Sequence, residues 1–235
     1  MTNPTTTPNG KRLLSRLIGW GLVGQIAVAV LLLVPGTAKY WQGWAFMSVN
    51  LVVTVAFCTY LYQLDPQVLE RRLLRKEKVG AQKIVLFLMK EVSVIFYLLC
   101  GLDNRFGWSR AFIGPVPWWL TLLALACYAG GYLQFFPVMK ANRFASSIIQ
   151  VEAGQTIADT GPYRLVRHPM YAIGIFLWFW MPLALGSFVV LPVAMLIIPI
   201  LMFRLLNEEK FLRRELPGYA EYCQRTRYRL IPLVW

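Results

Sequence analysis

The longest apolar block of the chain, residues 171–206, constrains the fold more than any other feature. It is about twice as long as the roughly 20 residues that one transmembrane helix requires. The stretch MPLALGSF lies at its middle, where Pro182 and Gly186 are residues typical of a turn. The block therefore predicts two helices that cross a membrane as a hairpin.

Further apolar stretches precede this hairpin. Hydrophobic residues make up 57% of the 235-residue chain and charged residues only 15%, against roughly 45–50% and 25% in ordinary soluble domains. We expect spans near residues 17–35, 43–63, 84–101 and 116–139. Lys90 and Glu91 interrupt the third of these. The predicted fold is all-α: a polytopic membrane helix bundle of about five to six spans, with a C-terminal helical hairpin.

Basic residues divide unequally between the two sides that these spans define. The side with both chain ends carries 20 of the 24 Lys and Arg residues, and the other side carries Lys39, Arg105 and Arg110. Loops rich in Lys and Arg remain in the cytoplasm. We therefore predict an integral membrane protein with both termini cytoplasmic, and we expect it in a bacterial inner membrane.

Composition also bears on partners and metals. The net charge is +13, but basic residues confined to loops between spans indicate topology, so we expect membrane lipids and no nucleic acid as partners. The cysteines are not spaced as metal ligands, and three of the four lie in apolar runs: Cys58, Cys100, Cys127 and Cys223. This pattern predicts neither a disulfide framework nor a metal site.

The motif TGPYRLVRHPMYAIG (residues 160–174) leads into the hairpin and holds the only histidine, His168. Pro169 disfavours helical geometry at the residue before it and suits the first position of a helix. His168 is therefore expected just before a helix N-terminus, whose free N–H groups attract an anion. Tyr163 and Tyr171 add aromatic faces and hydroxyls. These residues favour a binding site; the alternative is an interfacial anchor, because Tyr and Arg collect at membrane surfaces.

A second motif, RLLNEE (residues 204–209), ends the hairpin on the same side of the membrane. Arg204 and Glu208 are four residues apart and share a helix face, whereas Glu209 points roughly 100° away. A solvated ion pair is one interpretation. The other is a site in which the carboxylate binds an amine or ribose and the guanidinium binds a carboxylate or phosphate. The aromatic and basic tail that follows is expected to fold back over this site or to lie on the membrane.

From Phe135 onward the sequence resembles the isoprenylcysteine carboxyl methyltransferase family, which is related to the membrane phospholipid N-methyltransferases. The resemblance rests on GQTIADTGPYRLVRHPMY, a helical hairpin and RLLNEEKFLRRELPGYAEYCQRTRYRLIP, in that order. It implies a methyltransferase region over residues 140–235, with the hairpin and a cytosolic tail. We expect N-terminal membrane spans over 17–139 and a cytosolic polar tail over 1–16.

The resemblance also implies a cofactor, S-adenosyl-L-methionine, bound without a Rossmann domain in a cytosolic pocket that opens sideways to lipid. The implied cofactor-binding residues are Gln155, Thr156, Ile157, Ala158, Tyr163, His168, Pro169, Met170, Tyr171 and Glu208. Arg204 is implied to orient the acceptor. The family often has His-x-Leu-Val at residues 155–158, where Gln155 still donates and accepts hydrogen bonds. Adjacent glycines in AGGYLQF (residues 129–135) replace a Gly-x-Gly associated with the phospholipid enzymes.

The implied function is methylation of a carboxylate on a lipophilic or lipid-anchored acceptor, as in protein-S-isoprenylcysteine carboxyl O-methyltransferase. One alternative is a phosphatidylethanolamine-type phospholipid N-methyltransferase, which would need a base such as Glu208, Glu209 or His168. The other is a non-enzymatic membrane protein, such as a transporter subunit or scaffold.

The predicted topology can be tested with a reporter enzyme fused after Trp235. A reporter that works only in the cytoplasm should be active there, because the basic side of the bundle carries both chain ends. Activity only of a reporter that requires export would contradict the topology.

Overall fold

The structure is a computed structural model that describes residues 8–64, 80–142, 144, 151 and 154–235. Its elements are α1 (Pro8–Leu33), α2 (Trp41–Leu64), α4 (Gly80–Phe106), α5 (Trp108–Phe112), α6 (Trp118–Ala141), η2 (Gly161–Arg164), α7 (Pro169–Ala184), α8 (Leu191–Met195), α9 (Ile197–Glu215) and α10 (Tyr219–Arg225). No β-strand occurs within these described residues. The predicted all-α fold is confirmed.

Four of these elements are long and apolar enough to cross a membrane: α2, α4, α6 and the combined α8–α9 segment (Leu191–Glu215). Two shorter apolar helices, Gly21–Leu33 of α1 and α7, accompany them. The predicted third span is an unbroken 27-residue helix, α4, and Lys90 is an exposed residue within it. The chain is therefore an integral membrane protein built as a helical bundle.

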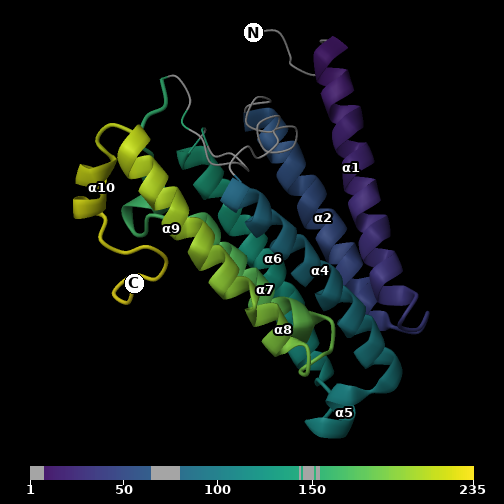
Figure 1. Cartoon of the computed structure of the whole chain (residues 1–235). Helices are drawn as coiled ribbons and strands as arrows, with labels where there is room; N and C mark the ends of the chain where they lie inside the picture. Colours follow the sequence, from purple (N-terminus) through teal and green to yellow (C-terminus); the bar gives the residue numbers. More distant parts are fainter. Residues whose placement is uncertain (1–7, 65–79, 143, 145–150, 152–153) are drawn as a thin grey trace.

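The long helices alternate in direction along the bundle (Figure 1). The α1–α2 turn, α5 and α8 lie at one end, which we call the α5 end. The end of α9 and α10 lie at the opposite end, the α10 end. Both predicted motifs, residues 160–174 and 204–209, therefore come to the α10 end, as the sequence predicted. Of the basic residues counted for topology, Arg71, Arg72, Arg75, Lys76, Lys78 and Arg143 lie outside the described residues.

The hairpin turns where the sequence predicted it. α7 ends at Ala184, and Gly186 follows with φ 72°, a left-handed conformation that suits glycine. A side chain there would also lie 3.0 Å from Nε2 of Gln42. The Tyr40 hydroxyl donates a buried hydrogen bond to the Leu185 carbonyl, at 2.6 Å. The turn is thus fixed both by its own backbone and by the α1–α2 corner.

Ser109 connects this turn to the corner between α4 and α5. Its N–H and hydroxyl donate to the Asp103 carboxylate at 2.7 and 2.5 Å. Its hydroxyl oxygen also accepts from the backbone N–H groups of Phe188 at 2.9 Å and Val189 at 3.1 Å. Ser109 and Asp103 are buried. These bonds fix the α7–α9 hairpin relative to α4 at the α5 end.

Gly131 allows α6 and α7 to pack in close contact. A Cβ atom at this position would lie 2.6 Å from Cδ2 of Leu177, inside the contact distance of real side chains. On α7, Trp178 packs edge-on against the fully buried Phe96 of α4, with ring centroids 5.3 Å apart. α7 is therefore packed on both sides, and its N-terminal end is fixed where the two motifs meet.

Replacing Ser109 with alanine should destabilise the bundle by about 1–3 kcal/mol, because the N–H groups of Phe188 and Val189 would lose their buried acceptor. Thermal unfolding of the purified protein in detergent measures this. Ser48→Ala is the matched control, since the exposed Ser48 hydroxyl bonds only the Trp44 carbonyl of its own helix. Equal unfolding temperatures for the two variants would contradict the proposed role of Ser109.

Candidate functional site

A cavity of about 390 Å³ lies between α4, α7 and α9 at the α10 end. Its volume falls in the range of roughly 300–1,000 Å³ that is typical of ligand pockets. Ten of the eleven predicted site residues line it: Gln155, Thr156, Ile157, Ala158, Tyr163, His168, Met170, Tyr171, Arg204 and Glu208. Pro169 is not among the lining residues; it is the buried first residue of α7. Two motifs about 40 residues apart in sequence therefore share one cavity.

Inside the cavity, Tyr171 connects the two charged residues of α9. Its hydroxyl donates to Oε2 of Glu208 at 2.5 Å and accepts from Nε of Arg204 at 3.1 Å. Arg204 is buried, and its Nη1 donates to Oε1 of Gln82 on α4 at 3.3 Å. Arg204 and Glu208 therefore share a helix face, as their spacing predicted, and their guanidinium and carboxylate lie side by side in the cavity.

His168 occupies the position that Pro169 predicts for it. Its φ of −127° and ψ of 61° lie outside the helical region, and α7 begins at the next residue. The imidazole is buried, with Nε2 3.2 Å from Oε1 of Glu209. Its ring also contacts that of Tyr171, with centroids 5.7 Å apart. The histidine therefore lines the cavity while one of its ring nitrogens faces the Glu209 carboxylate.

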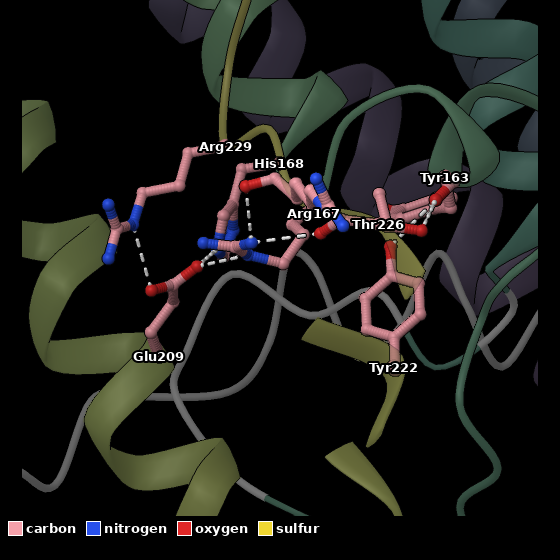
Figure 2. A network of polar contacts seen from close by, with 8 residues as sticks. Tyr163, Arg167, His168, Glu209, Tyr222, Thr226 and Arg229 are labelled. Carbon is pink, nitrogen blue, oxygen red and sulfur yellow. Dashed lines mark hydrogen bonds and ion pairs between the residues drawn. The ribbon is translucent and has the colours of Figure 1, made fainter. Parts of the chain in front are cut away.

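Glu209 is the centre of a buried ion cluster at the α10 end (Figure 2). Nε of Arg167 lies 2.6 Å from its Oε1, and Nε of Arg229 lies 3.0 Å from its Oε2. The Arg167 Nη1 group donates further to the carbonyls of Thr226 and Arg227, at 2.8 and 2.7 Å. A buried carboxylate is costly unless cations and hydrogen bonds surround it, and here both do.

The C-terminal segment folds back against the loop that precedes α7, which is the first of the two predicted alternatives. The N–H groups of Arg167 and His168 donate to the carbonyls of Tyr228 and Arg229, each at 2.9 Å. The Tyr222 hydroxyl donates to the Tyr163 carbonyl at 2.8 Å (Figure 2). α10 thereby becomes a wall of the cavity.

Two tyrosines of this wall, Tyr219 and Tyr222, line the cavity. Burial is the main cause that raises the pKa of each phenol above its usual value. Both side chains therefore remain protonated at neutral pH and can donate hydrogen bonds.

Several lining residues were not predicted from the sequence. They are chiefly Leu86 and Met89 of α4, with Arg167, Tyr219 and Tyr222 near the C-terminal segment. Leu86 and Met89 are three residues apart, a spacing that marks one helix face. That spacing is visible in the sequence, but the helix that the face contacts is not.

The fold and the cavity define a polytopic membrane protein with a ligand pocket at one end of its bundle. Part of the chain is similar to one known protein family. Residues 119–217 match the model of the family described as phospholipid methyltransferase. This match confirms the family resemblance predicted from the motifs, over residues 119–217. The region spans α6, the cavity-lining loop, α7 and α9.

The chain is also 26% identical over 156 residues to the cobalt-zinc-cadmium resistance protein CzcN of Cupriavidus metallidurans. The similarity covers 65% of this chain and 63% of that relative, so the chain spans less than two thirds of the relative's length.

Glu209→Gln should destabilise the protein by about 3–5 kcal/mol, because removal of one charge leaves the buried Arg167 without its carboxylate. It should also speed amide hydrogen exchange at Arg167 and His168, whose N–H groups bond the C-terminal segment. Thermal unfolding and mass-spectrometric hydrogen exchange measure the two effects.

The matched control is Glu215→Gln on the same helix. Glu215 pairs with Arg214 at the surface, and such exposed pairs contribute only about 0–1 kcal/mol. Similar losses in both variants would mean that the ion cluster does not hold the C-terminal segment in place.

Proposed function

We propose that the protein is an S-adenosyl-L-methionine-dependent methyltransferase that methylates a carboxylate on a lipophilic or lipid-anchored acceptor, as protein-S-isoprenylcysteine carboxyl O-methyltransferase does. One observation carries the proposal. Arg204 and Glu208, on one face of α9, line the same cavity as residues 155–158, His168, Met170 and Tyr171. This cavity belongs largely to the region that matches a methyltransferase family.

The cavity has the chemistry that the cofactor requires. Glu208 offers a carboxylate for the cationic amine or the ribose hydroxyls, and Gln155 offers an amide that donates and accepts. Apolar and aromatic side chains, including Ile157 and Tyr163, provide surfaces for the adenine ring. When bound, S-adenosyl-L-methionine supplies a methyl group already activated by its sulfonium. The residues of the protein then have to bind and orient the two reactants.

Arg204 is placed to orient an acceptor carboxylate. The guanidinium is held by the Tyr171 hydroxyl and by Gln82, and a planar guanidinium pairs with a carboxylate through two parallel hydrogen bonds. A carboxylate is ionised near neutral pH. Its oxygen can therefore take the methyl group as an ester without first losing a proton, so a catalytic base is not required.

Phospholipid amine methylation is a second candidate, favoured by the description of the matching family. That reaction requires a base to remove a proton from the amine. Among the three candidates, Glu209 is engaged by Arg167 and Arg229, and the His168 imidazole faces Glu209. Glu208 accepts from Tyr171. Because all three candidate bases already take part in hydrogen bonds or ion pairs, the site supports a carboxylate acceptor better than an amine acceptor.

Two variants separate the proposed roles on α9. Arg204→Ala should lower methyl transfer about 100-fold or more, because the acceptor loses its orientation, while cofactor affinity stays nearly unchanged. Glu208→Gln should weaken cofactor binding about tenfold or more through loss of a charged hydrogen bond. Calorimetry with S-adenosyl-L-methionine and turnover with methyl-labelled cofactor on membrane extract provide the two measurements.

Glu215→Gln, an exposed change on the same helix, serves as the control for both variants. Arg204→Ala that loses cofactor affinity, or that keeps wild-type turnover, would overturn the assigned roles. Failure of the folded wild-type protein to bind S-adenosyl-L-methionine would favour a non-enzymatic transporter subunit or scaffold instead.

A further inference from the structure

The deep part of the cavity is apolar on each of the three helices that form its walls. On every helix the lining residues are spaced so that they share one face. From the α10 end inward, these residues are Leu86 and Met89 on α4; Met170, Tyr171, Gly174 and Trp178 on α7; and Leu212, Glu208, Arg204 and Leu201 on α9. The level of Tyr171, Arg204 and Glu208, where the polar groups lie, is the mouth of the cavity, and the apolar part deeper in the bundle is its floor.

The depth of this gradient follows from helix geometry. At 1.5 Å per residue, Met89 lies about 10 Å deeper along α4 than Gln82, and Trp178 lies about 10 Å deeper along α7 than Tyr171. The floor is rigid because Trp178 packs against the buried Phe96. Phe135, which also lines the cavity, packs against Phe57 with ring centroids 5.7 Å apart.

We infer that this face of α4 selects the methyl acceptor. Gln82 holds Arg204 at the level of the acceptor's head group, and Met89 limits the length of the apolar chain below it. The inference rests on the proposed function, in which Arg204 binds the acceptor carboxylate. The acceptor class is then an amphiphile with an anionic head and a single apolar chain directed from the mouth toward the floor.

Gln82 is suited to holding Arg204 in place because its side chain is neutral and buried. It is 1% exposed, and its oxygen accepts from Nη1 of Arg204. A neutral acceptor fixes the guanidinium without cancelling its charge. A glutamate at this position would pair with Arg204 and compete with an anionic head group.

α4 lies outside residues 119–217, the part of the chain that matches the methyltransferase family. The cofactor motifs and Arg204 lie inside that region, whereas Gln82, Leu86 and Met89 do not. The residues that select the acceptor are therefore on a different helix from Glu208. Substitutions on α4 can change the acceptor preference while the cofactor-binding residues stay the same.

The test measures binding of straight-chain saturated carboxylates, from hexanoate to hexadecanoate, to full-length protein in phospholipid nanodiscs. The readout is displacement of fluorescent dansyl-undecanoic acid, which needs no turnover. Met89→Phe should shift the tightest-binding acid to a shorter chain and weaken the longest acids about tenfold, since misfit in an apolar pocket has effects of this size. Met89→Ala should shift the preference to longer chains, which keeps the test decisive if the larger residue disturbs folding.

Leu88→Phe is the matched control: the same change, one residue away, at a position that is 43% exposed and does not line the cavity. Its length preference should equal that of the wild type. Gln82→Glu should weaken all carboxylates about tenfold, by loss of a charged interaction, without altering the length preference. The corresponding uncharged alcohols should bind Gln82→Glu and wild type equally.

Two results would overturn the inference: wild-type protein that binds none of these acids, or Met89 variants whose length preference matches that of Leu88→Phe. Failure of the proposed function has a different signature. In that case the chain-length shifts persist, but the protein binds no S-adenosyl-L-methionine and transfers no methyl group.

Discussion

The mouth of the cavity depends on one buried carboxylate, Glu209. It contacts Arg167 and His168 from the loop before α7 and Arg229 from the C-terminal segment, and so joins three segments that are distant in sequence. Two backbone hydrogen bonds between residues 167–168 and 228–229 complete the connection. The neighbouring Glu208 points roughly 100° away around α9, into the cavity. Of these adjacent glutamates, Glu209 therefore connects the walls of the cavity, and Glu208 lines its interior.

The opposite end of the bundle supports this arrangement. Ser109 and Asp103 hold the α7–α9 turn, and Gly131 lets α6 pack closely on α7. Because these contacts set how far α7 and α9 extend relative to each other, Tyr171 and Arg204 meet at hydrogen-bonding distance near the α10 end. Packing far from the cavity therefore contributes to the geometry inside it.

Much of the fold could be predicted from the sequence because its strongest signals are local. Apolar block length indicated the spans, Pro169 indicated the helix start beside His168, and the spacing of Arg204 and Glu208 indicated a shared face. Gln82 could not be predicted, because it begins an apolar helix and its role depends on which helix packs against it. The spacing likewise predicted the direction of Glu209, but not the two arginines and the histidine that surround its carboxylate.

The central claim is transfer of a methyl group to a carboxylate held by Arg204. Purified protein should be incubated with methyl-labelled S-adenosyl-L-methionine and membrane extract, and the labelled products then treated with mild base. A methyl ester releases its label as volatile methanol, whereas a methylated amine retains it. The account predicts base-released label that disappears in Arg204→Ala. Label that stays bound to a phospholipid amine, or no transfer at all, would contradict it.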